Sequence, residues 1–79
     1  MDTQKAVLLV DEINGCLPDN RALRFAEEVK GHDRYYKIYM IFSIGETATK
    51  YVVHISTSLS EIIACLEFTR NVTPALVAK

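Results

Sequence analysis

Residues 34–70 read RYYKIYMIFSIGETATKYVVHISTSLSEIIACLEFTR, and this is the most informative stretch of the chain. In its first part large apolar side chains recur at every second position, at Tyr36, Ile38, Met40, Phe42 and Ile44. A period of two residues predicts a half-buried β-strand. Gly45 then leads a turn of either two or four residues, and a second alternating strand follows it. The stretch therefore predicts a β-hairpin.

The two strands of this hairpin are expected to share one apolar inner face. On the second strand that face is continued by Tyr51, Val53 and Ile55. The opposite, outer face would carry Tyr35, Lys37, Tyr39, Lys50, Val52 and His54. Because the two turn lengths differ by an even number of positions, both predict the same residues on each face.

The end of the same stretch predicts a helix that begins with a capping box. Ser58 and Glu61 have the spacing at which each side chain reaches the other residue's backbone N–H. The stripe expected to pack on the sheet is Leu59, Ile62, Ile63 and Leu66. Residues 71–73, which also fit a glycosylation sequon, are interpreted as the end of the helix because Pro74 follows.

Two further apolar side chains of this helix, Cys65 and Phe68, lie outside that stripe. A helix that is apolar over so much of its circumference must be covered on a second side. The cover is expected from the tail residues Val72, Leu76 and Val77 or from another chain.

The N-terminal segment predicts a helix that begins at Asp2 or Thr3 and ends at Gly15. Its apolar stripe comprises Ala6, Leu9, Val10, Ile13 and Cys16 or Leu17. The run Ala6–Val10 is also short and apolar enough to be a buried strand, so that alternative stays open.

The segment from Pro18 to Gly31 predicts a second helix. Pro18 suits a first helical turn, and a shared helical face is formed by Ala22, Phe25, Ala26 and Val29. However, Leu23, Phe25 and Val29 also alternate, so residues 23–29 could instead form a strand that pairs with the next one.

Together these elements predict one α+β domain, residues 1–79, in the order α-α-β-β-α with the helices on one face of the sheet. The alternatives are α-β-β-β-α and β-α-β-β-α. The first alternative resembles double-stranded RNA-binding domains, in element order only. Residues 58–62 lack the lysines that those domains present to phosphates, so the resemblance does not imply RNA binding.

Composition and charge favour a small protein of the cytoplasm. Two cysteines are too few for a disulfide framework, and no apolar run approaches the roughly 20 residues of a membrane span. Nine basic and ten acidic residues nearly balance, although residues 34–57 hold three basic residues and one acidic residue. This distribution lacks the basic stripe typical of proteins that bind nucleic acid through phosphates.

The sequence predicts neither catalysis nor a cofactor or metal. The acidic pair Asp11-Glu12 follows an apolar run, but no phosphate-binding glycine loop accompanies it. Cys16 could pair with His32 or His54 as thiolate and base, but no third group is evident to orient the imidazole. The cysteines and histidines also lack the close spacing of a zinc site.

The expected function is therefore binding: an adaptor-like, inhibitor-like or otherwise regulatory protein that recognises another protein. Because 49% of so short a chain is hydrophobic, self-association as a homodimer is also expected. The candidate partner-binding residues are Tyr35, Lys37, Tyr39, Lys50, His54, Cys65 and Phe68. The alternative is a nucleic-acid-binding module that uses the tyrosines, lysines and histidine of the hairpin as a stacking surface.

Overall fold

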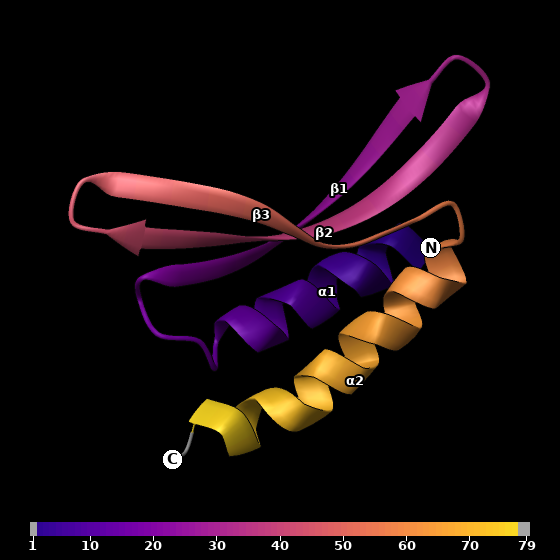
Figure 1. Ribbon diagram of the computed structural model, residues 1–79. Helices are drawn as coiled ribbons and strands as arrows, with labels where there is room; N and C mark the ends of the chain where they lie inside the picture. The colour runs from indigo at the N-terminus through magenta and orange to yellow at the C-terminus, as the bar shows by residue number, and fades with distance from the viewer. Residues whose placement is uncertain (1, 78–79) are drawn as a thin grey trace.

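The chain folds into two layers, a three-stranded antiparallel sheet and a pair of helices (Figure 1). The computed structural model describes the backbone of residues 2–77 and the side chains of residues 3–73. The elements in chain order are α1 (Asp2–Asn14), β1 (Arg21–Lys30), β2 (Asp33–Ile44), β3 (Thr47–Ser56) and α2 (Leu59–Val77). Both helices lie against one face of the sheet, so the α+β class is confirmed, in the order α-β-β-β-α.

The N-terminal helix is confirmed, and the alternative of a strand at residues 6–10 is wrong. The predicted stripe is buried at Ala6, Leu9, Val10 and Ile13. Of the two alternatives for the last position of the stripe, Leu17 packs against the core, whereas Cys16 is exposed. The reason is that α1 ends at Asn14, and Cys16 lies in the following turn, where its N–H donates to the carbonyl oxygen of Ile13 at 2.9 Å.

The predicted second helix is wrong, because residues 21–30 form strand β1. Leu23 lies opposite Met40 and Phe25 opposite Ile38, so the alternating side chains reach the core. Pairing with residues 33–42 of β2 outweighs the helix propensity of the segment, although most of its residues are good helix formers. Gly31, with a φ of 63°, makes possible the two-residue turn that joins β1 to β2.

The predicted hairpin of β2 and β3 is confirmed, with the shorter turn, Gly45-Glu46. Its face assignment is wrong beyond Val52. Tyr39 pairs with Val52 whereas Ile38 pairs with His54, so Val53 is the extra residue of a β-bulge. A bulge reverses the side of every later residue on its strand. Consequently Val53 and Ile55 are 47% and 53% exposed instead of facing the core.

The stripe predicted for the last helix is confirmed, since Ile62, Ile63 and Leu66 are buried and Leu59 packs against them. The predicted end at residues 71–73 is wrong, because α2 continues to Val77. Buried Thr73 anchors this part of the helix, and its hydroxyl donates to the carbonyl oxygen of Thr69 at 2.6 Å. The cover predicted from the side chains of residues 76 and 77 lies outside the described residues.

A single core cluster lies between the helices and the sheet. It consists of Ala6, Leu9, Val10, Ile13, Leu23, Ile38, Ile62, Ile63 and Leu66. Both hairpins reach beyond this core (Figure 1). The radius of gyration, 13.2 Å, accordingly exceeds the roughly 12 Å expected for a compact domain of this length.

Candidate protein-interaction surface

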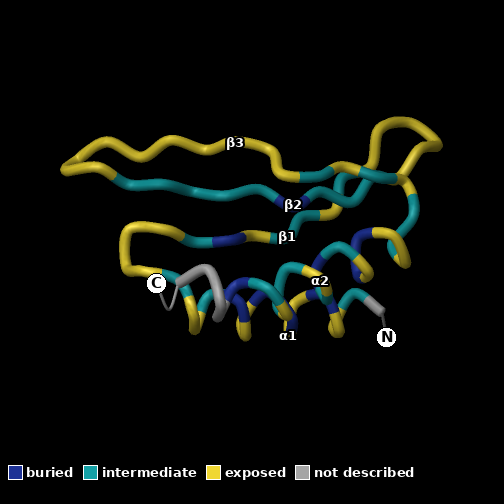
Figure 2. Tube along the Cα trace, turned by 60° about the horizontal axis from the view of Figure 1, so that its bottom comes forward, coloured by how far each residue is buried: buried dark blue, intermediate teal, exposed yellow. Residues whose placement is uncertain are grey.

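One face of the sheet has no covering layer among the described residues. Both helices lie on the opposite side, and the strand register determines which side chains point away from them. We call this surface the open face. Its larger side chains are Glu28, Tyr35, Lys37, Tyr39, Ile41, Lys50, Val52 and Ile55. Figure 2 shows that most of β3, at one edge of this face, is exposed.

The charged side chains of the open face are held by contacts within the face. Lys37 donates to a carboxylate oxygen of Glu28 at 2.7 Å. This hydrogen bond and the accompanying charge lower the pKa of Glu28 from its ordinary value. The ammonium group of Lys50 lies 4.9 Å from the centroid of the Tyr39 ring, in cation–π geometry. Both lysines therefore sit in defined positions beside the tyrosines.

Apolar and aromatic side chains occupy the rest of the open face. Tyr35, Tyr39 and Ile41 are half-buried on the central strand β2. Val52 and Ile55, on the edge strand β3, are 54% and 53% exposed. A flat surface of this kind can bury apolar area against a partner while its tyrosine hydroxyls and lysines form hydrogen bonds at the margin.

His54, expected on the outer face, lies instead on the side of the helices. Its Nε2 is 3.2 Å from a carboxylate oxygen of Glu61, and the Ser56 hydroxyl donates to the other oxygen at 2.8 Å. The predicted capping box is therefore half formed. The N–H of Glu61 donates to the Ser58 hydroxyl at 3.3 Å, but the Glu61 side chain turns to β3, and the N–H of Ser58 donates to Ser56.

The arrangement of Ser56, His54 and Glu61 joins β3 to the start of α2 and is unsuited to nucleophilic catalysis. The carboxylate lies between the hydroxyl and the imidazole, so no hydrogen bond joins the serine to the histidine, as an activated nucleophile would need. The hydrogen bonds from Ser56 and His54 lower the pKa of Glu61. The role of the cluster is structural, because it holds the start of α2 against β3.

The remaining candidates lie apart from the open face. Cys65 is half-buried against the core and Phe68 is 68% exposed, both on α2. Cys16 and His32 lie at opposite ends of β1, a strand of about 30 Å, so they do not come together as thiolate and base. Among residues 3–73 no three histidine, cysteine or acidic side chains gather as metal ligands.

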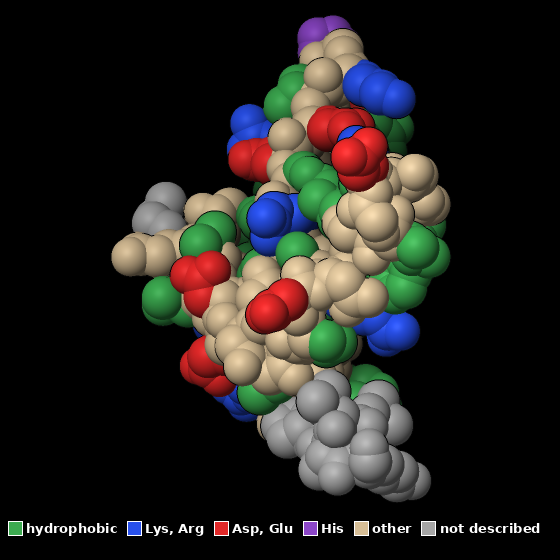
Figure 3. All heavy atoms as spheres, turned by 90° about the vertical axis from the view of Figure 1, so that its left-hand side faces the viewer, with side chains coloured by type: hydrophobic (Ala, Val, Ile, Leu, Met, Phe, Trp, Pro, Cys, Tyr) green, Lys and Arg blue, Asp and Glu red, His purple; other side chains and the backbone are tan. Residues whose placement is uncertain are grey.

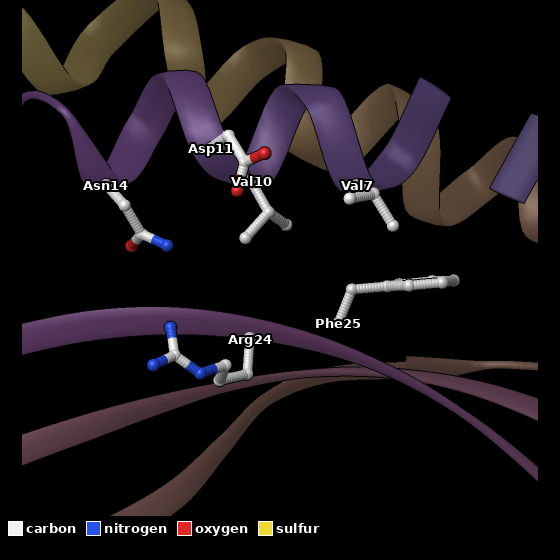
Figure 4. A pocket seen from close by; sticks show the side chains of 6 residues that line it. All are labelled: Val7, Val10, Asp11, Asn14, Arg24 and Phe25. Atoms are coloured by element: carbon white, nitrogen blue, oxygen red, sulfur yellow. The ribbon is translucent and has the colours of Figure 1, made fainter. Parts of the chain in front are cut away.

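A shallow depression of about 280 Å³ lies between α1 and the edge of β1 (Figure 4). It is lined by Val7, Val10, Asp11, Asn14, Arg24 and Phe25. Two of its polar groups are already engaged, since the amide of Asn14 and the guanidinium of Arg24 both bond to the backbone of Leu23. The depression is slightly smaller than typical ligand pockets and offers few free polar groups.

Sequence reasoning missed Ile55 as part of the open face. The bulge that turns it outward has no reliable signal in a run such as Tyr51-Val52-Val53, whose residues suit either face of a strand. The role of Glu28 as the partner of Lys37 was also missed, because that contact exists only if residues 21–30 form a strand.

Comparisons of the chain with protein-family models, with curated proteins and with solved structures gave no match. Within the described residues neither helix combines the length and the apolar character needed to cross a membrane.

Proposed function

We propose that this protein acts by binding another protein on the open face of its sheet. The observation that supports the proposal is that no described residue covers this face, although Ile41, Val52, Ile55 and two tyrosines lie on it. An antiparallel sheet can leave one face to water when that face is polar. This face is only partly polar, and tyrosine is enriched at protein interfaces.

The distribution of charge favours a protein partner over nucleic acid, the runner-up. Lys37 is already paired with Glu28, and the first turn of α2 carries Glu61 and no lysine. Viewed from the end to which the β2–β3 hairpin points, acidic and basic side chains are intermixed (Figure 3). Binding of phosphates would require a basic surface with free cations.

The proposal predicts that Tyr39→Ala abolishes recognition of the partner. Tyr39 is central on the open face, and loss of a central tyrosine from an interface typically costs about 2 kcal/mol, or roughly 30-fold in Kd. The measurement is affinity purification from the source cells with mass spectrometry of bound proteins. The matched control is Leu8→Ala, which removes an exposed apolar side chain from α1, on the other side of the sheet.

We expect to find a protein that binds the wild type and the Leu8→Ala variant but not the Tyr39→Ala variant. Binding to it should survive moderate salt. If the Tyr39→Ala variant folds and retains every partner, the proposal is wrong. If the bound material is nucleic acid, with affinity that falls steeply with salt and depends on Lys37 and Lys50, the runner-up replaces it.

A further inference from the structure

The two edges of the sheet differ in how well their backbone groups are protected from pairing with another strand. At the β1 edge, the side-chain amide of Asn14 accepts from the N–H of Leu23 at 2.7 Å and donates to its carbonyl oxygen at 3.0 Å. The amide thus takes the place of a neighbouring strand at this position. Charged side chains, among them Glu27 and Lys30, follow toward the end of β1. Such features discourage edge-to-edge pairing.

Along residues 47–52 the β3 edge is less protected among the described residues, because its bulge comes only at Val53. The register directs the N–H and carbonyl groups of Ala48, Lys50 and Val52 away from β2, toward the open side. Residues 47–53 are all exposed, and Lys50 is the only residue among them with a charged side chain. An exposed strand edge with β-branched residues is a template for pairing with another strand.

A second apolar feature lies on the same side of the molecule. Glu61 bonds to His54 and Ser56 of β3, which marks one flank of α2 as the flank toward β3. Cys65, Phe68 and Val72 follow Glu61 at helical spacing and share that flank. The opposite flank faces α1, as the contacts Lys5–Glu67 and Glu12–Arg70 show. Phe68 is therefore exposed on the β3 side of the helical layer.

We propose that β3 and this flank of α2 form the interface with a second copy of the chain, as a two-fold symmetric dimer. Antiparallel pairing of β3 with β3 of the second copy would give a continuous sheet of six strands. Both pairs of helices then lie under the same face, so the two flanks that carry Phe68 face each other. The β1 edges stay outermost, where Asn14 protects them, and assembly ends at two copies.

The charge of Lys50 disfavours one register for this pairing, and an axis at Tyr51 avoids it. A two-fold axis at Lys50 would place the two ammonium groups opposite each other, which is unfavourable. An axis at Tyr51 instead pairs Lys50 with Val52 of the second copy in both directions and joins the exposed backbone groups of both residues. The two Tyr51 residues then form the central non-hydrogen-bonded pair.

The area that a stable dimer must bury favours contacts through both the β3 edge and the flank of α2. A stable dimer typically buries about 800 Å² on each partner. That is roughly a seventh of the 5518 Å² surface of this chain. A strand edge alone offers less than this, so the flank of α2 supplies the remainder. The inference does not depend on the proposed function, because the pairing uses the backbone edge of β3 and the flank of α2 and leaves the open face uncovered.

The test is sedimentation of the full chain over a wide concentration range, with a proline on each edge in turn. Among the described residues the register points the N–H of Val52 away from β2, so Val52→Pro should keep the fold and raise the dimer dissociation constant about 30-fold or more. The matched control is Glu27→Pro, since the N–H of Glu27 faces the open side of the β1 edge. Circular dichroism checks that both variants are folded.

We expect a concentration-dependent dimer. Val52→Pro should weaken it, and Glu27→Pro should not. Should the proline variant not fold, Val52→Lys serves instead, since it keeps the strand and places a charge opposite Lys50 of the second copy. A folded wild-type chain that stays monomeric at the highest concentration overturns the proposal. So does a dimer that neither Val52 variant weakens.

Disulfide trapping tests the register. In a Cys16→Ser, Cys65→Ala background, Tyr51→Cys should cross-link under mild oxidation, since Cα atoms in a non-hydrogen-bonded pair are about 4.5 Å apart. Thr47→Cys is the control, because the two copies of residue 47 would be about 26 Å apart along the strands. Cross-linking at 47 but not at 51 overturns this register.

Discussion

At the scale of single residues, Glu61 shows how one side chain can join two elements of structure. Its backbone N–H is capped by Ser58, and its carboxylate bonds to His54 and Ser56 at the end of β3. The helix N-terminus also favours a negative charge in its first turn. The carboxylate therefore fixes the start of α2 against the sheet.

Acidification is predicted to remove this contribution. The pKa of Glu61 is lowered below its ordinary value of 4.5, so the folded state favours the charged carboxylate. Its stabilisation is present above pH 4.5 and is lost as the pH falls through the lowered pKa. The difference in unfolding free energy between wild type and Glu61→Gln should therefore be largest near neutral pH and shrink in acid.

Urea unfolding at several pH values measures this difference. The control is Glu46→Gln at the hairpin turn, whose carboxylate bonds to none of the described residues and which reports the effect of net charge alone. A Glu61→Gln difference that stays constant from neutral to strongly acidic pH would contradict the role of the carboxylate.

At the scale of elements, Asn14 links the end of α1 to the edge of β1. Replacing it with alanine leaves the N–H and carbonyl of Leu23 without these partners at a half-buried position. The expected loss is about 1–2 kcal/mol of unfolding free energy, read from urea midpoints. Asn71→Ala, on the exposed side of α2, should change it by less than about 0.5 kcal/mol. Equal losses in both variants would argue against the edge role of Asn14.

The elements also show which parts of the fold the sequence could predict. Periodicity correctly identified α1, the β2–β3 hairpin and the buried stripe of α2, since each has one dominant period. It failed for β1, where a helical face and a strand alternation coexist at Leu23, Phe25 and Val29. Pairing with β2 decides between them, and pairing is a tertiary effect that local propensity does not contain.

The candidate site was predicted in part for a related reason. Tyr35, Lys37, Tyr39 and Lys50 share the open face as expected, because they precede the bulge. His54 follows the bulge and therefore faces the helices. One extra residue, Val53, is enough to reverse the faces, and its position depends on how the sheet bends over the core.

At the scale of the whole molecule, the described residues leave apolar surfaces of the chain uncovered. Nine apolar side chains form the buried cluster, while Val52, Ile55 and Phe68 are each more than half exposed. A chain of this size cannot bury all its apolar area in one small core. The open face is available to a protein partner, and the β3 edge with the flank of α2 to a second copy.

Site-specific photo-cross-linking in the source cells tests directly whether another protein binds the open face. A photoreactive phenylalanine analogue at position 39 lies on the open face, and the same analogue at position 8 lies on α1, on the other side of the sheet. We predict a covalent adduct with another protein from position 39 and none from position 8. Binding on the open face would be contradicted if the variant at position 39 folds but forms no adduct while position 8 does.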